Sequence, residues 1–124
     1  MTYNILLDNK KIGTSQLEHA DPPMGVVFGT ITFSDTTFNF EFFNKYFTDN
    51  KIAADIDAES NIIIAAAIPN LKVFNDKGAE IIGEACTISG MDSDVYDITI
   101  LGVPYPFYEE EFPHHVKAYD DKFN

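Results

Sequence analysis

Residues 71–103 constrain the fold more than any other part of the chain. Two turn-forming clusters, Asn75-Asp76-Lys77-Gly78 and Gly90-Met91-Asp92-Ser93, divide them into three runs rich in β-branched and aromatic residues. In the run after the second cluster, apolar and polar residues alternate, so that strand has one apolar face and one polar face. Runs of this kind between turn residues are typical of consecutive antiparallel strands. The pattern predicts a three-stranded β-meander.

The N-terminal part of the chain predicts a hairpin and a further strand. Residues 3–7 alternate apolar and polar side chains before a polar turn, and residues 12–17 form the returning run. Residues 18–23 are expected to be a connector, because their two adjacent prolines lack amide donors and cannot lie inside a sheet. Residues 24–33 are expected to form one strand, in which two glycines mark a bulge or the close approach of another backbone.

Residues 38–47 contain six aromatic side chains and favour a helix. At helical spacing these rings fall within an arc of about 200°, with polar residues on the opposite side. Asp35 or Thr36 is expected to cap the start of this helix. Residues 48–61 are polar and predict a loop. Residues 61–68 fit either a buried strand or a helix, and their β-branched run favours the strand.

The C-terminal segment combines prolines, aromatic residues and carboxylates. Pro106 is expected to open one short helical turn and Pro113 a second helix, since proline is favoured at the first helical position. Val116, Tyr119 and Phe123 recur at helical spacing, which predicts that this end of the chain packs against the rest of the molecule.

Together these elements predict an α+β fold dominated by an antiparallel β-sheet. The sheet is expected to form a sandwich or partial barrel, with one central and one C-terminal helix. With 124 residues, the chain is expected to form a single domain that spans residues 1–124. Cys86 is the only cysteine, so the chain cannot form an internal disulfide and depends on packing.

The charge balance limits the kinds of partner. The chain has 20 acidic residues and 8 basic ones, all of them lysines, and its formal net charge is −12. Nucleic-acid binding needs clustered cationic side chains, so we expect no nucleic-acid partner. No apolar run is long enough for a membrane span or a signal peptide, so we expect no membrane association and a cytoplasmic location. A basic protein is the natural electrostatic partner of such a chain.

The strongest candidate site is an interaction surface in which aromatic anchors interleave with carboxylates. Tyrosine and phenylalanine are favoured anchors at protein interfaces, and acidic residues around them suit a basic partner. We therefore predict a non-enzymatic acidic protein-binding module, in its most concrete form an inhibitor or immunity-type protein that neutralises a basic protein. The predicted partner-binding residues are Tyr105, Phe107, Tyr108, Glu109, Glu110, Glu111 and Phe112.

Two alternatives stay open. The first is a small hydrolase or metal-dependent enzyme that uses His114 or His115 with nearby acids. Adjacent helical histidines diverge by about 100°, and no metal-binding or cofactor motif is recognisable, so we predict no metal site, no cofactor and no catalytic residue. Cys86 lies among apolar residues and is expected to be a core side chain, not a nucleophile. The second alternative is a self-associating module in which exposed aromatic residues are buried in a symmetric dimer.

Residues 17–29 and 102–116 together resemble segments of small bacterial proteins that carry no assigned activity. The resemblance implies a bacterial source and a complete domain. It implies no activity, and no functional residue is transferred to this chain from it.

Overall fold

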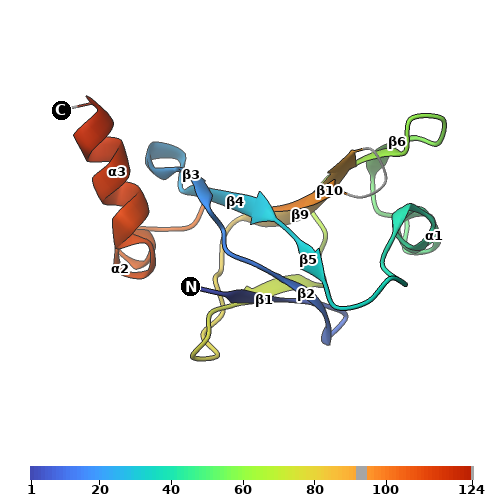
Figure 1. The fold of residues 1–124 in the computed structure, drawn as a ribbon, viewed down its shortest axis with the longest axis horizontal. Coiled ribbons are helices and arrows are strands. Elements are labelled where there is room, and N and C mark those ends of the chain that lie inside the picture. Colours follow the sequence, from blue (N-terminus) through green and yellow to red (C-terminus); the bar gives the residue numbers. More distant parts are fainter. Residues whose placement is uncertain (92–94, 124) are drawn as a thin grey trace.

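Two antiparallel sheets, of four and six strands, form the body of the molecule in the computed structural model, which describes residues 1–91 and 95–123 (Figure 1). The smaller sheet has the order β5-β2-β1-β8 and the larger has the order β3-β4-β10-β9-β7-β6. The predicted α+β antiparallel fold is confirmed. The described strands are β1 (Tyr3–Leu7), β2 (Lys10–Ser15), β3 (His19–Asp21), β4 (Val26–Thr30), β5 (Thr32–Phe33), β6 (Ala54–Asp57), β7 (Ile62–Ala65), β8 (Leu71–Phe74), β9 (Ala85–Met91) and β10 (Val95–Leu101).

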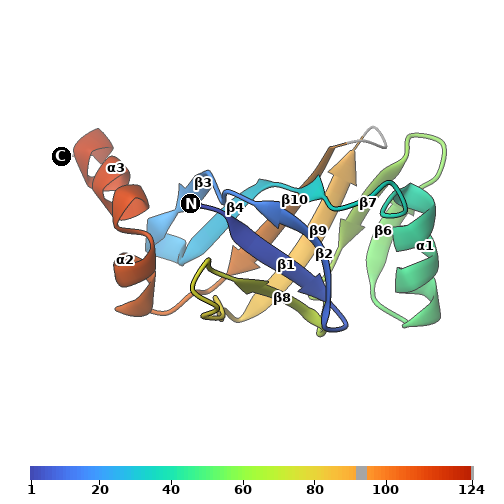
Figure 2. The same cartoon turned by 60° about the horizontal axis from the view of Figure 1, so that its bottom comes forward.

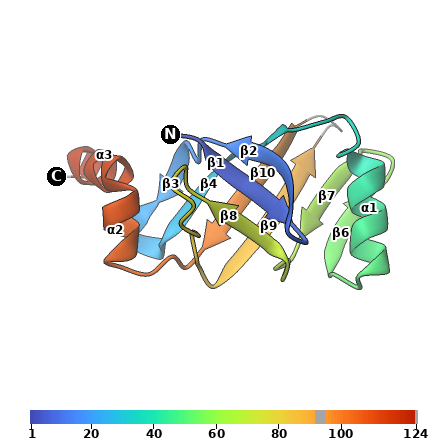
Figure 3. The same cartoon turned by 90° about the horizontal axis from the view of Figure 1, so that it is seen from below.

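Helices lie at both ends of the long axis. The described helices are the 3-10 turn η1 (Pro22–Met24) and the α-helices α1 (Phe40–Asp49), α2 (Phe107–Glu111) and α3 (Pro113–Phe123). Figure 3 places α1 beside β6 and β7 at one end, and α2 and α3 at the other. None of the described helices is long and apolar enough to cross a membrane.

The predicted N-terminal hairpin is confirmed. In β1, Tyr3, Ile5 and Leu7 are buried and alternate with half-buried residues. Asp8 and Asn9 form the two-residue turn to β2, with φ values of 52° and 66°. Aspartate and asparagine tolerate positive φ better than most residues, and a turn with two such residues matches the right-handed twist of paired strands.

The core lies between the two sheets, whose strands cross each other in Figures 2 and 3. Apolar side chains on the inner face of each sheet exclude water from this layer, which is the main favourable term in folding. The side chains at its centre include Ile5, Leu7, Ile12, Val27, Ile63, Val73, Ile88, Ile98 and Ile100, all of them 3 % exposed or less.

The chain passes from one sheet to the other at Ile31, and residues 24–33 are therefore not one strand as predicted. β4 pairs with β10 in the larger sheet, whereas β5 pairs with β2 in the smaller one. Between them Ile31 is buried, and its amide donates to the Tyr96 carbonyl at 2.7 Å. Such a corner allows one extended run to serve two sheets that pack across each other.

The predicted aromatic helix is α1, and its cap differs from the prediction. Asn39, not Asp35 or Thr36, caps the helix, because its side-chain oxygen accepts the Phe42 amide at 3.0 Å. The side chains of Phe40, Phe43 and Phe47 point into the core. The ring centroid of Phe43 lies 5.2 Å from that of Tyr96 on β10, so α1 closes one end of the space between the sheets.

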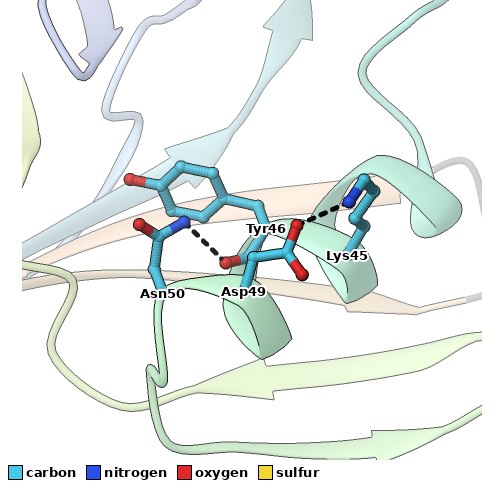
Figure 4. A network of polar contacts seen from close by, with 4 residues as sticks. All are labelled: Lys45, Tyr46, Asp49 and Asn50. Carbon is cyan, nitrogen blue, oxygen red and sulfur yellow. Dashed lines mark hydrogen bonds and ion pairs between the residues drawn. The ribbon is translucent and has the colours of Figure 1, made fainter.

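The C-terminal end of α1 has local polar contacts (Figure 4). The Lys45 ammonium lies 2.6 Å from the Asp49 carboxylate, and the Asn50 side-chain amide donates to the Tyr46 carbonyl at 2.8 Å. The Tyr46 carbonyl also accepts the backbone amide of Asn50 at 3.0 Å, so the C-cap residue donates to it twice. The ion pair is exposed and contributes little to stability.

The predicted three-stranded meander is wrong in its first strand. β9 and β10 pair as expected, but β8 pairs with β1 in the other sheet. The middle strand begins at Ala85 instead of Ala79, and residues 79–84 cross from one sheet to the other. In the second predicted turn cluster, Gly90 and Met91 belong to β9, whereas Asp92 and Ser93 lie outside the described residues.

Two segments that were expected to be irregular contain short edge strands. β3 lies in the predicted connector and pairs with β4, while β6 lies in the predicted loop and pairs with β7. Both strands are short and mostly exposed, so the alternation in Ala54-Asp55-Ile56-Asp57 is too brief to identify a strand by itself. Pairing with a neighbour that is already fixed in the sheet, not local periodicity, makes them strands.

Both predicted C-terminal helices are present, but the second packs less than expected. Val116 packs against the core, whereas Phe123 is 62 % exposed. Among the described residues of α3, none is fully buried. The prediction that Phe123 packs down is therefore wrong.

The cap of α1 provides a test of this fold. Asn39→Ala is expected to decrease the free energy of unfolding by about 1 kcal/mol, because the Phe42 amide loses its acceptor. Asn39→Asp retains an acceptor and is expected to retain most of that stability. Asn44→Ala, in the middle of the same helix, is the control and should raise stability by up to about 0.7 kcal/mol, because alanine has the higher helix propensity. Urea denaturation followed by circular dichroism measures all three, and equal effects of the two alanine variants would contradict the capping role.

Candidate functional site

Two rings of the predicted partner-binding segment are inside the molecule. Tyr108 and Phe112 are fully buried. The Tyr108 hydroxyl donates to the Val26 carbonyl at 2.8 Å, and the ring centroid of Phe112 lies 5.6 Å from that of Tyr3. These rings fix the C-terminal segment to both sheets. They cannot contact a partner in this fold, so we remove them from the predicted surface.

Glu111 also has a structural role that the sequence did not reveal. Its carboxylate accepts hydrogen bonds from the Tyr3 hydroxyl at 2.9 Å and from the Asn75 side-chain amide at 3.0 Å. The side-chain oxygen of Asn75 in turn accepts the amides of Lys77 and Ala79, which closes the first turn cluster. One carboxylate therefore connects α2 with β1 and with the turn after β8.

The other residues of the predicted segment reach the surface. Tyr105 is 47 % exposed, although its hydroxyl donates to the Pro22 carbonyl at 2.9 Å. Phe107 is half-buried, and Glu109 and Glu110 are exposed. These four residues remain candidates for contact with a partner.

A groove of about 560 Å³ lies beside Phe107, between the chain segment that leads into β9 and the segment that leaves β10. Its volume is in the range typical of ligand and peptide pockets. We call it the acidic groove. Its lining residues are Glu80, Ile82, Gly83, Glu84, Gly102, Pro104 and Phe107.

Two glycines allow the walls of the acidic groove to approach each other. A Cβ atom on Gly83 would collide with the Leu101 carbonyl oxygen, and one on Gly102 would lie 2.6 Å from Cγ of Glu84. Gly102 also has a φ of 67°, a conformation in which other residues are strained. The Glu84 amide donates to the Leu101 carbonyl at 2.7 Å, which holds the two segments together.

The lining of the acidic groove is apolar with acidic groups beside it. Ile82 is 62 % exposed and gives the groove aliphatic surface that contacts water. Among the described lining residues, both charged side chains, those of Glu80 and Glu84, are carboxylates. Sequence reasoning missed these three residues because it assigned them to a strand; the small residue Gly83 was the available signal for a close approach at this point.

The two histidines of the enzymatic alternative lie at the start of α3. Their ring centroids are 4.2 Å apart, and Nε2 of His115 donates to the Leu17 carbonyl at 2.7 Å. Burial, and then the neighbouring His115, lowers the pKa of His114. Within residues 1–91 and 95–123, no group of three His, Cys, Asp or Glu side chains is placed to hold a metal ion. Contacts within the fold thus account for the position of both rings.

Cys86 lies half-buried in β9. Burial, followed by the nearby carboxylate of Glu80, raises the pKa of its thiol to about 12. A thiolate is the reactive form of cysteine, and at neutral pH this side chain is almost entirely protonated. The geometry agrees with a packing role for Cys86.

Comparison of the chain with protein-family models, with curated proteins and with solved structures finds no match.

Alkaline pH is expected to destabilise the fold through Tyr3 and Tyr108. Burial, followed for Tyr3 by its hydrogen bond to Glu111, raises the pKa of both phenols above their ordinary value. Above about pH 10 the unfolded chain loses these protons while the folded chain keeps them. The free energy of unfolding should therefore decrease as the pH rises past that value, which urea denaturation at a series of pH values measures.

The variant Tyr108→Phe separates the titration of the buried phenols from the charge repulsion that destabilises an acidic protein at alkaline pH. The variant should lose about 1 kcal/mol at neutral pH, because the hydrogen bond to the Val26 carbonyl is missing. Its further loss between neutral and alkaline pH should be smaller than that of the parent protein, since one buried phenol no longer titrates. Parallel pH profiles for the two proteins would contradict the role given to Tyr108.

Proposed function

We propose that the protein is a non-enzymatic, cytoplasmic binding module that docks a basic segment of a partner protein in the acidic groove. An inhibitor or immunity-type protein that neutralises a basic protein is the most concrete form of this proposal. The observation that carries it is the exposed Ile82 beside Glu80 and Glu84, in a groove that also presents the half-buried ring of Phe107.

The apolar part of the groove supports docking of a protein side chain. Ile82, Pro104 and Phe107 offer aliphatic and aromatic surface that water covers in the free protein. Transfer of such surface from water to a partner side chain is favourable by about 25 cal/mol for each Å² buried. Interface cores are built in the same way, with aromatic and aliphatic anchors surrounded by polar residues.

The charge supports a basic partner. Glu80 and Glu84 line the groove. The exposed Glu110 lies one helical turn after Phe107 on α2. The formal net charge of −12 extends this local field over the whole molecule. Such a field accelerates the encounter with a cationic surface and opposes that with an anionic one.

The test uses a synthetic peptide of alternating lysine and leucine, which carries both features that the groove should recognise. Its affinity for the protein is measured by calorimetry, together with the double variant Glu80→Gln/Glu84→Gln. The matched control is Glu41→Gln/Glu59→Gln, which changes the net charge by the same amount at exposed sites away from the groove.

Loss of the two groove carboxylates is expected to weaken peptide binding about fivefold, and the control pair by less than about twofold. Ile82→Ser should weaken binding by a similar factor with little effect on its dependence on salt, because it removes apolar contact and no charge. Equal losses for the two glutamine pairs would show non-specific attraction to an acidic protein and would exclude the groove as the docking site.

A further inference from the structure

The chain segment that leads into β9 is bonded to β8 along one edge. The amide of Ile81 donates to the Val73 carbonyl at 2.8 Å, and the carbonyl of Ala79 accepts the amide of the residue after β8 at the same distance. Between these two bonds, Phe74 and Glu80 face each other as an isolated antiparallel bridge. Hydrogen bonds on either side of such a pair leave the N–H and C=O groups of the pair itself pointing away from each other. The backbone polar groups of Glu80 therefore point away from β8.

The same geometry extends to Ile82. The side chain of Ile81 is buried and that of Ile82 is exposed, as in an extended chain whose side chains alternate between two faces. The N–H and C=O groups of Ile82 thus point the same way as those of Glu80. Within residues 1–91 and 95–123, no backbone hydrogen bond uses the groups of either residue. Residues 80–82 therefore present an unpaired strand edge.

This edge borders the acidic groove. Glu80 and Ile82 line one wall of the groove, and Pro104 and Phe107 line the wall across from it. Unpaired N–H and C=O groups at the edge of a strand are a template for another extended chain. A helix in the groove would cover these groups without bonding to them, because its own N–H and C=O groups are bonded within the helix. Polar groups that are covered without a partner are costly.

We infer that the partner segment docks in the acidic groove as an extended β-strand, which pairs with the edge at Glu80 and Ile82. The inference rests on the function proposed above and specifies its partner as a basic segment in extended conformation. Backbone hydrogen bonds contribute affinity for any extended chain. The exposed Ile82, the ring of Phe107 and the carboxylates select apolar and basic side chains from it.

N-methylation of the peptide tests strand pairing without altering the protein. In an extended chain of alternating lysine and leucine, the leucine amides point to one edge and the lysine amides to the other. One peptide carries N-methyl groups on all its leucines and a second carries them on all its lysines, and calorimetry compares both with the unmodified peptide. The peptide whose methylated edge faces Glu80 and Ile82 is expected to bind at least about tenfold more weakly, and the other within about threefold of the unmodified peptide.

Exchange of amide protons with water, followed by NMR, identifies the protein groups that bond to the peptide. The amides of Glu80 and Ile82 should exchange about tenfold more slowly when roughly 90 % of the protein is bound. The controls are the amides of Thr36 and Ala58, which are also exposed and are not among the donors of a backbone hydrogen bond, and which lie outside the groove lining. Their exchange should not change.

The variant Ile82→Pro removes the N–H group on the protein side. Proline lacks the amide donor but keeps more apolar surface than serine. We therefore expect Ile82→Pro to weaken peptide binding more than Ile82→Ser does, whereas loss of apolar contact alone predicts the opposite order. Circular dichroism verifies that both variants are folded.

Failure of strand pairing and failure of the proposed function give different results. Equal affinities of the two N-methylated peptides, or unchanged exchange at Glu80 and Ile82, would overturn strand pairing. If peptide binding still depends on the carboxylates of Glu80 and Glu84, the acidic groove then remains the docking site. If the unmodified peptide does not bind, or binds without dependence on these carboxylates, the proposed function fails and strand pairing fails with it.

Discussion

The unequal width of the two sheets is the constraint on which the rest of the structure depends. A four-stranded sheet can cover only the middle of the inner face of a six-stranded one, so apolar side chains toward both ends need another cover. The helix α1 covers one end through Phe43 and Phe47, and the C-terminal segment covers the other through Tyr108 and Phe112 (Figure 3). The core is complete only when both ends are closed.

The acidic groove is a consequence of this arrangement. The C-terminal segment attaches through a few large rings and the hydrogen bonds of Glu111, and concave surface remains on either side of these contacts. Burial of an unpaired carboxylate is costly, so most of the acidic residues stay at the surface, where they outnumber the lysines. The hollow that exposes Ile82 is therefore bordered by negative charge.

Local patterns were sufficient for the elements whose sequence signals are local. The β1–β2 hairpin, α1 and the two C-terminal helices follow from alternation, helical spacing and the positions of proline. The same patterns could not show that β8 pairs with β1 instead of β9, because alternation identifies a strand but not its neighbour. Nor could they reveal β3 and β6, whose short and exposed sequences become strands only beside an existing sheet edge.

The sequence by itself determined the α+β class, the negative charge and the concentration of aromatic and acidic residues near the C-terminus. Only the tertiary structure decided which of these residues are available, by burying Tyr108 and Phe112, tying Glu111 to Tyr3, and leaving Ile82 exposed. The physical reason is that burial depends on contacts between segments far apart in the chain. Composition and periodicity describe a segment alone and carry no record of what lies against it.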